Sequence, residues 1–258
     1  MSAPAAPYEL LAGRPDRTSP FVTSYDGPAQ VVELSVVSSM NNVAKAAGLL
    51  RDELGLQPGD RLSLDLPLHW QLPIWTLAGL SVGLQCGYRL DGHVEVRLVG
   101  PPGLADLAGG ASAEADDILA CACDAFGMPV PGGVPSGIMD VGVAARAHPD
   151  VLAVDRGAVA SAAILLPADE SDPGDDLRVV AWADLLAAGP VDPPGSRTWV
   201  SAEALAAAGL PAAAVLRRAA VDPLLRSGSV VLARDVPAAD EQRLRAIQGA
   251  EPDLPASS

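Results

Sequence analysis

The sequence predicts an α/β fold: a mostly parallel sheet with helices on both of its faces. Nearly half of the 258 residues, 49%, are apolar, which is enough for a substantial core. Short apolar runs of strand length alternate along the chain with longer runs of helical periodicity. Because neighbouring parallel strands need crossover connections, usually helices, this alternation predicts parallel pairing.

The clearest single element is an amphipathic helix near the start of the domain. From Val36 the apolar positions step by four and three as far as Leu54. Ser35 is placed to cap its first turn, and Gly55 is placed to end it.

The remaining elements follow from alternation, spacing and turn residues. Strands are expected at 61–66, 94–99, 159–166, 197–201 and 228–233. Helices are expected at 69–82, at 202–225 with interruptions, and at 238–247. Residues 100–155 carry many glycines and prolines and predict no firm element.

The domain organisation expected from these patterns is a single α/β domain with flexible ends. Residues 1–20 and 251–258 are unpatterned and rich in Pro or Ala, so they are expected to be flexible. The domain itself comprises a first half at about 21–125, a glycine- and proline-rich middle at about 126–158, and a second half at about 159–250, together 21–250.

Charge and composition exclude several classes of partner and site. A formal net charge of −15 would repel nucleic acid and anionic membrane surfaces, so neither is expected as a partner. The sequence shows no signal peptide and no apolar run long enough to cross a bilayer, which predicts a cytoplasmic protein. Three cysteines, Cys86, Cys121 and Cys123, are expected to be buried thiols, and no metal site or cofactor is expected.

One part of the sequence resembles a known family. Residues 32–86 read as a short strand, a helix, the turn 56–61, an apolar strand and a helix ending in glycine. That order resembles the opening of adenylate-forming (AMP-binding, acyl-CoA synthetase-like) enzymes. The stretches 49–56 and 66–71 are also similar to a family of short, uncharacterised proteins from high-GC bacteria that is distantly related to these enzymes. The resemblance concerns the N-terminal subdomain of the large enzymes only.

The resemblance implies a phosphate-binding loop after residue 166, and the sequence departs from it there. The large enzymes have a loop rich in Ser, Thr and Gly with a lysine, whereas this chain has Asp169 to Asp176, within which five carboxylates accompany one glycine. The carboxylates of such a loop would repel the phosphates of ATP unless a magnesium ion bridged the two. The alternative interpretation is a solvated surface turn that binds no ligand. Lys45, the only lysine, matches neither catalytic lysine of the family and is interpreted as a surface charge.

The candidate ligand-binding residues are His69 and Trp70. They follow the C-terminal end of the strand at 61–66, the edge at which open α/β sheets bind ligands. Packing at the start of a helix is the alternative interpretation. His93 and His148 lie in turns and are expected to be exposed. The aromatic-bearing turn 124–129 also resembles the short family and has no assigned role.

Taken together, the sequence predicts a noncatalytic relative of the adenylate-forming enzymes, with no catalytic residue assigned. It is expected to bind a small acyl-like or aromatic molecule, or a protein partner. One alternative is a residual acyl-activating enzyme that acts with a partner domain. A second is an enzyme with a reduced active site at the C-terminal edge of the sheet, in which His69 is the acid or base. Another is a purely structural role within a larger complex.

Overall fold

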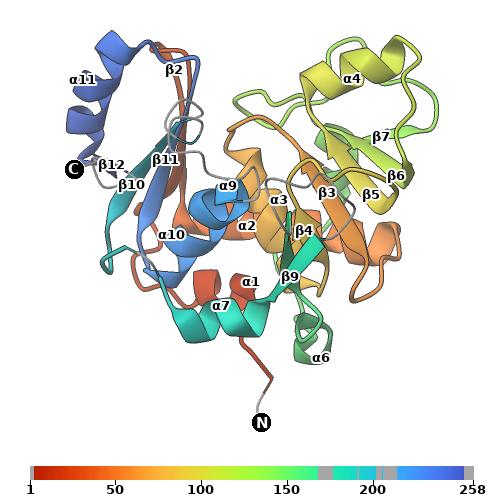
Figure 1. The fold of residues 1–258 in the computed structure, drawn as a ribbon, viewed down its shortest axis with the longest axis horizontal. Coiled ribbons are helices and arrows are strands. Elements are labelled where there is room, and N and C mark those ends of the chain that lie inside the picture. The colour runs from red at the N-terminus through yellow and green to blue at the C-terminus, as the bar shows by residue number, and fades with distance from the viewer. Residues whose placement is uncertain (1–2, 168–176, 191, 202–204, 206–213, 253–258) are drawn as a thin grey trace.

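The computed structural model describes residues 3–167, 177–190, 192–201, 205 and 214–252 (Figure 1). Its strands form two sheets. The five-stranded sheet has the order β12-β10-β11-β1-β2, and the seven-stranded sheet has the order β7-β6-β5-β3-β4-β8-β9. The acidic segment from Asp169 to Asp176 and most of 202–213 lie outside the described residues.

The five-stranded sheet joins the two ends of the chain. Its strands are β1 (Pro20–Asp26), β2 (Gln30–Ser35), β10 (Arg197–Ser201), β11 (Ser229–Arg234) and β12 (Glu251–Pro252). β1 pairs in parallel with β11, and β11 with β10, whereas β1 and β2 form an antiparallel pair. The first strand of the domain is therefore completed by strands more than 170 residues later in the chain, a pairing that no local pattern indicates.

The seven-stranded sheet contains the central part of the chain. Its strands are β3 (Arg61–Asp65), β4 (Gln85–Gly87), β5 (Val94–Val99), β6 (Ala115–Ala120), β7 (Ile138–Asp140), β8 (Ala163–Pro167) and β9 (Leu177–Ala181). All its pairs are parallel except β8 with β9. The predicted α/β class with a mostly parallel sheet is confirmed, although the sequence predicted one sheet and not two.

Helices pack between the two sheets and outside them. They are α1 (Pro7–Ala12), α2 (Val36–Gly48) with its π-helical extension η1 (Leu49–Glu53), α3 (Gln71–Ser81), α4 (Pro101–Ala108), α5 (Val141–Ala144), η2 (Ala145–Ala147), α6 (Arg156–Val159), α7 (Trp182–Ala188), α9 (Ala214–Leu216), η3 (Arg217–Val221), α10 (Asp222–Leu225) and α11 (Ala238–Gln248). Figure 1 shows α2 and α3 in the centre, α11 outside the five-stranded sheet and α4 outside the seven-stranded one. No helix among the described residues is long and apolar enough to span a membrane.

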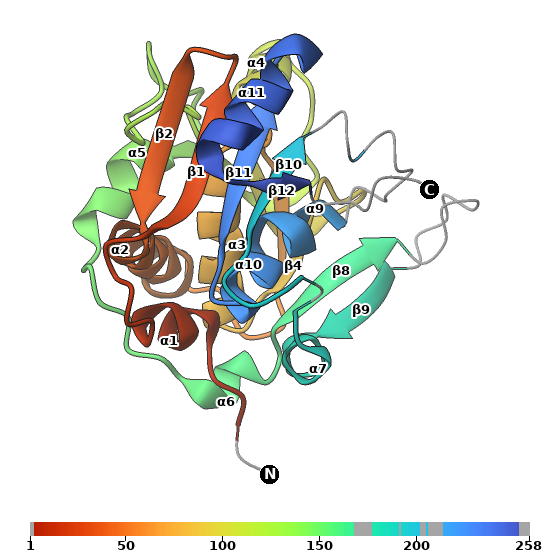
Figure 2. The same cartoon turned by 90° about the vertical axis from the view of Figure 1, so that its left-hand side faces the viewer.

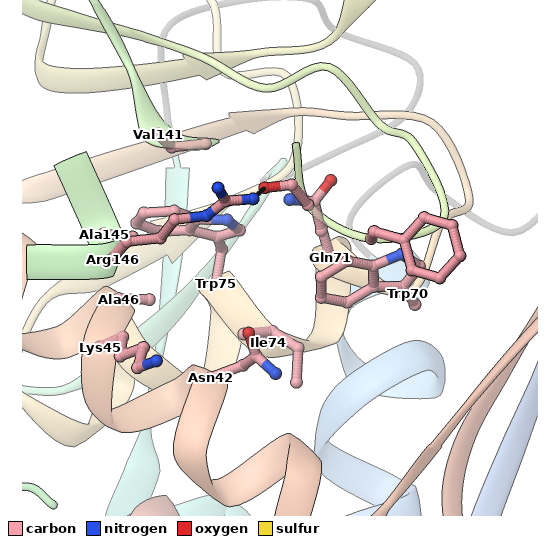
Figure 3. Close-up of a pocket in the computed structure, with 12 residues that line it drawn as sticks. Asn42, Lys45, Ala46, Trp70, Gln71, Ile74, Trp75, Val141, Ala145 and Arg146 are labelled. Atoms are coloured by element: carbon pink, nitrogen blue, oxygen red, sulfur yellow. Dashed lines mark hydrogen bonds between the residues drawn. The ribbon is translucent and has the colours of Figure 1, made fainter. Parts of the chain in front are cut away.

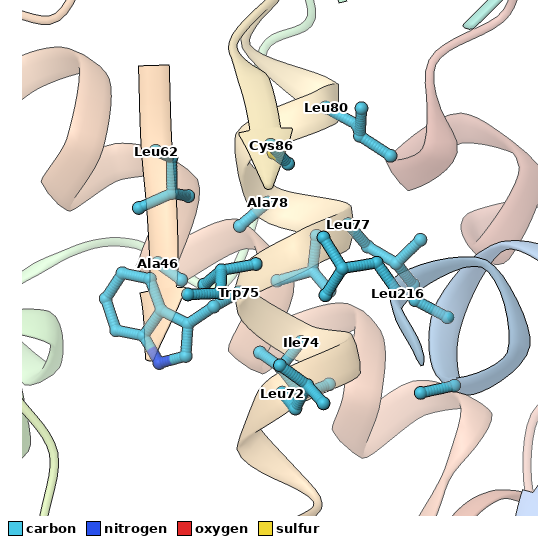
Figure 4. Close-up of a cluster of buried hydrophobic side chains, with 14 of the residues drawn as sticks. Ala46, Leu62, Leu72, Ile74, Trp75, Leu77, Ala78, Leu80, Cys86 and Leu216 are labelled. Carbon is cyan, nitrogen blue, oxygen red and sulfur yellow. The ribbon is translucent and has the colours of Figure 1, made fainter. Parts of the chain in front are cut away.

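The core is centred on α3, whose residues are all buried. A helix that is apolar on every side is typical of a position inside a protein. Helix α3 contacts β3 and β4 of the seven-stranded sheet and the helical segments α1, α2 and η3. Gly79 allows the close packing: a Cβ there would lie 2.7 Å from the Cys86 Sγ atom and 2.9 Å from a methyl of Leu62. Figure 4 shows this cluster, in which Leu77 and Leu72 join α3 to the rest of the core.

The N-terminal segment differs from the flexible end that the sequence predicts. Residues 7–12 form α1, which Figure 2 shows beside α2, and Tyr8 and Leu11 are buried. The Tyr8 backbone N–H donates to the Ser81 Oγ atom at the end of α3. Burial of these apolar side chains orders a segment that has too few periodic positions to be recognised as a helix.

Several predicted elements are confirmed with small shifts, and one is wrong in part. The helix from Val36 has Ser35 as its cap, and β5, β10, β11 and α11 lie where they are expected. The strand expected at 159–166 begins only at Ala163, because Asp155 caps the short helix α6, which ends at Val159. The stretch 100–155 also contains α4, β6 and β7, which the sequence did not predict.

Candidate functional site

The candidate site lies where β3 ends and α3 begins. His69 and Trp70 occupy this connection, each only 4% exposed, with their rings 5.5 Å apart between centroids. The two side chains face different cavities. Trp70 lines a cavity of about 200 Å³, called here the aromatic pocket, and His69 lines a cavity of about 390 Å³, called here the histidine hollow.

The aromatic pocket is built from α2, the start of α3, the 126–127 turn and the 141–146 segment. Its apolar walls are Trp70, Ile74 and Trp75, and Phe126 lies at its rim. Its polar lining consists of Asn42, Lys45, Gln71 and Arg146. Figure 3 shows Asn42 and Lys45 reaching into the pocket from α2, and Gln71 and Arg146 facing it from another side. The pocket thus combines aromatic walls, which suit a flat apolar group, with polar side chains at one end.

The polar groups of the aromatic pocket are mainly N–H donors. Arg146 donates to the Gly127 carbonyl oxygen at 3.3 Å, and no described carboxylate pairs with its guanidinium. Among the described residues, no hydrogen bond uses the Gln71 Nε2 or the Trp75 Nε1 atom. The Lys45 Nζ atom lies 2.9 Å from the Asp150 carboxylate. These N–H donors and cations favour a ligand that supplies acceptor oxygens, above all a carboxylate.

A short turn, 124–128, separates the aromatic pocket from the histidine hollow. Its first residue, Asp124, accepts the Trp70 Nε1–H through its carbonyl oxygen at 3.1 Å. The Asp124 carboxylate accepts the backbone N–H groups of Phe126 and Met128, at 2.7 Å each, which fixes the turn. Phe126 is 83% exposed at the mouth of the aromatic pocket. The turn therefore positions the Trp70 ring as a wall of the aromatic pocket and the Phe126 ring at its rim.

The histidine hollow lies between the β1–β2 hairpin and the 123–125 segment. Ala29, Val31, Val32 and Ala125 give it a largely apolar lining, to which Ser24, Asp26, Gln30, Cys123 and Asp124 add polar groups. Asp26 pairs with Arg234. The hollow thus has two carboxylates in its lining, one of them paired with Arg234, whereas the polar lining of the aromatic pocket consists mainly of N–H donors.

The His69 ring is neutral at ordinary pH. Burial is the main cause that lowers its pKa to about 4, and the positive charge of Arg234 lowers it further, against the opposite effect of Asp124 and Asp26. The Nδ1 atom accepts the Gln71 backbone N–H at 3.4 Å. Because a neutral imidazole whose Nδ1 accepts carries its proton on Nε2, the ring presents one donor on that side.

The other residues singled out in the sequence lie elsewhere. His93 is exposed as predicted and lies 3.1 Å from Asp116. His148 is not exposed, contrary to the prediction: its side chain is 12% exposed, it lies 2.9 Å from Glu53, and it packs against the open face of Gly48. Lys45 is half-buried at the aromatic pocket, so its interpretation as a plain surface charge is incomplete.

The cysteines are three buried free thiols, as the sequence predicts. Cys121 and Cys123 lie together, with their Sγ atoms 3.6 Å apart, whereas Cys86 lies under α3. Across the described residues, no three His, Cys, Asp or Glu side chains are grouped so that they could hold a metal ion.

Sequence reasoning missed most of the aromatic pocket. Arg146 falls in a stretch without a predicted element, and Gln71 and Trp75 read only as helix residues. The single available signal was the aromatic-bearing turn at 124–129, which the structure places against Trp70. Convergence of α2, α3 and the 141–146 segment is a tertiary feature that spacing along the chain does not encode.

Comparison with known proteins supports the fold. No family model matches the chain. It is 34% identical over 140 residues to a TIGR03089 family protein of Mycobacterium tuberculosis, which covers 53% of this chain and 57% of that protein. The chain thus spans little more than half the length of this relative.

Solved acyl-CoA synthetases share the architecture. An acyl-CoA synthetase of Brucella canis matches 95% of this chain and 46% of its own, with a TM-score of 0.73 and 14% identity. The acetoacetyl-CoA synthetase of Streptomyces lividans matches 95% of this chain and 41% of its own, with a TM-score of 0.68 and 20% identity. At these identities the likeness shows the adenylate-forming fold over less than half of each synthetase.

Proposed function

We propose that the aromatic pocket binds a small aromatic or acyl carboxylate without activating it. The observation that carries this proposal is the pairing of aromatic walls with N–H donors, in particular the Arg146 guanidinium, which has no carboxylate partner among the described residues. Arginine presents its donors in a fork that matches the two oxygens of a carboxylate. A ligand ring between Trp70, Trp75 and Phe126 would place its carboxylate at these donors.

The size of the aromatic pocket limits the ligand. Its volume of about 200 Å³ is smaller than the sites that enclose drug-sized molecules, so a single ring or a short acyl chain is the fitting class. A nucleotide is too large for it. The strongly acidic protein would also repel free anions in general, so the positive end of the pocket is what selects a carboxylate.

The proposal that adenylation is absent rests on the sequence of the loop and on the position of the only lysine. The segment Asp169 to Asp176 replaces a phosphate-binding loop with carboxylates. Lys45 lies on α2 and pairs with Asp150, so it is not in the connection between β8 and β9. We propose on this basis that the chain corresponds to the N-terminal subdomain of the synthetases with its nucleotide chemistry lost.

The alternative function is residual acyl activation in concert with a partner domain. The likeness to acyl-CoA synthetases over 95% of the chain favours it. A role for His69 as acid or base is disfavoured, since a pKa of about 4 makes the ring a weak base near neutral pH. A cytoplasmic location fits either function, because three buried free thiols suit a reducing compartment.

The test is a calorimetric titration with benzoate, hexanoate and the neutral isostere benzamide. Benzoate should bind, and benzamide should bind at least about ten-fold more weakly, because a charge-assisted hydrogen bond contributes roughly 1.5–3 kcal/mol. The Arg146→Gln variant should lose the preference for the acid. Arg243→Gln, a change of the same kind on the exposed face of α11, is the control that should retain it.

Three outcomes would contradict the proposal. Equal affinity for benzoate and benzamide would show that the donors do not select a carboxylate. Magnesium-dependent binding of ATP, or release of pyrophosphate when an acid is added, would favour the alternative of acyl activation. If no acid binds while the protein co-purifies with a stable protein partner, the pocket is instead part of a protein interface.

A further inference from the structure

Two thiols with no assigned role lie beside the candidate site. Cys121 directly follows β6, and Cys123 comes two residues later. Their Sγ atoms are 3.6 Å apart, and the Cys123 thiol donates to the Cys121 sulfur. Cys123 has a left-handed backbone, with φ of 52°, which bends the chain so that both side chains point to the same side.

The two thiols differ in access. Cys123 lines the histidine hollow and is 8% exposed, whereas Cys121 is 0% exposed behind it. A small molecule that enters the hollow therefore meets Cys123 before Cys121. Burial, and then the neighbouring Cys123, raise the pKa of Cys121 well above its ordinary value, so Cys121 is the poorer initial nucleophile.

The inner thiol is connected to the aromatic pocket. The Cys121 S–H donates to the Gln71 Oε1 atom at 2.6 Å, and Gln71 lines that pocket. The next residue after Cys123 is Asp124, whose carbonyl oxygen holds the Trp70 indole. A change at the two sulfurs therefore acts on Gln71 directly and on Trp70 through Asp124, the residue that follows Cys123.

We propose that Cys121 and Cys123 close an intramolecular disulfide when a hydroperoxide enters the histidine hollow, and that this closure weakens carboxylate binding in the aromatic pocket. The Cys123 sulfur attacks the terminal peroxide oxygen, the O–O bond breaks, and Cys123 becomes a sulfenic acid as water leaves from hydrogen peroxide, or the alcohol from an organic hydroperoxide. The Cys121 sulfur then displaces the hydroxyl, which leaves as water. One thiol proton goes to the leaving group of the first step and the other to the water of the second, and the peroxide is reduced as the two sulfurs are oxidised.

Closure requires only a local change. The sulfurs must approach from 3.6 Å to the bonding distance of about 2.05 Å. In the disulfide, Cys121 has no S–H, so the Gln71 Oε1 atom loses its donor, and the 123–124 backbone that holds Trp70 must shift with Cys123. Part of this inference rests on the proposed function, because the weakened ligand is the carboxylate proposed for the pocket.

The experiment combines a chemical and a binding measurement on the full chain. Hydrogen peroxide is added to reduced protein, and intact mass with thiol alkylation and peptide mapping identifies the bonded cysteines. Cys86, which is fully buried under α3, serves as the internal control that should stay reduced. The Cys123→Ser variant should form no disulfide and should keep its benzoate affinity after peroxide, since Cys123 does not line the aromatic pocket.

The expected result is loss of two hydrogen atoms mapped to Cys121 and Cys123, with benzoate binding about five-fold weaker, the factor that corresponds to one lost hydrogen bond, and restored by dithiothreitol. Persistence of both thiols, or over-oxidation without a disulfide, would overturn the inference. A disulfide with unchanged affinity would overturn its coupling to the pocket. If even reduced protein binds no acid, the proposed function fails, but the mass measurement and the indole fluorescence of the ligand-free protein still decide whether the disulfide forms and disturbs Trp70.

Discussion

His69 makes the stability of this protein depend on pH in a defined window. The ring is 4% exposed, and its pKa is lowered to about 4, mainly by burial and secondarily by Arg234. In the unfolded chain the pKa of a histidine is about 6.5. The unfolded state therefore binds a proton between these two values while the folded state does not.

The sign and size of the effect follow from this difference. Because the folded pKa is depressed, the stability that neutral His69 contributes is fully present above about pH 6.5 and is lost as the pH falls toward about 4. Between about pH 7 and about pH 5, one such group removes about 2 kcal/mol from the free energy of unfolding. Carboxylates with lowered pKa values, such as Glu9 and Glu95, lose stability chiefly at lower pH.

The assay is urea unfolding of the wild type and of His69→Gln at both pH values. The wild type should lose about 2 kcal/mol more than the variant between about pH 7 and about pH 5, whereas His93→Gln, which changes an exposed ring, should behave as the wild type. Carboxylates that interact with neither histidine contribute equally to all three proteins and cancel in the comparison. Equal losses in the wild type and in His69→Gln would refute the reasoning.

Three substitutions test the packing that positions the site. Leu77→Ala removes a fully buried side chain of α3 and should lower the free energy of unfolding by about 2–5 kcal/mol in denaturant titrations. Gly142→Ala would place a Cβ 2.4 Å from the Met128 carbonyl oxygen, so it should lower the melting temperature and the benzoate affinity together, whereas Gly103→Ala, whose nearest atom is 3.3 Å away, should change neither by much. Ser35→Ala removes the cap of α2 and should cost about 1 kcal/mol in the same titrations.

Local patterns were sufficient for elements whose signal lies within one stretch of chain. The strand at 94–99 alternates between buried and half-buried residues, and the helix from Val36 has both a cap and a periodic apolar face. Helix α3 was also found, although it is buried on all sides, because its length excludes a strand and Pro73 falls in its first turn. In each case burial and backbone preference favour the same structure.

The division into two sheets could not be predicted in this way. β1 pairs with β11 from the far end of the chain. The stability that this pairing contributes depends on α2 and α3, which fill the space between the sheets. The candidate site could not be predicted in full for the same reason, because it depends on tertiary contacts. His69 and Trp70 were identified because they follow a strand, but whether neighbouring side chains enter the same cavity depends on the 124–128 turn, which tertiary hydrogen bonds hold in place.

That turn also determines how the two cavities influence each other. Gly127 and Phe126 line the aromatic pocket, whereas Asp124 and Ala125 line the histidine hollow. Coupling between two sites is reciprocal, so if disulfide closure weakens a carboxylate about five-fold, saturating carboxylate must disfavour closure by about the same factor in equilibrium with glutathione. Occupancy of the aromatic pocket would thereby protect the two thiols in the reduced state, and a titration of the disulfide against glutathione with and without benzoate measures this factor directly.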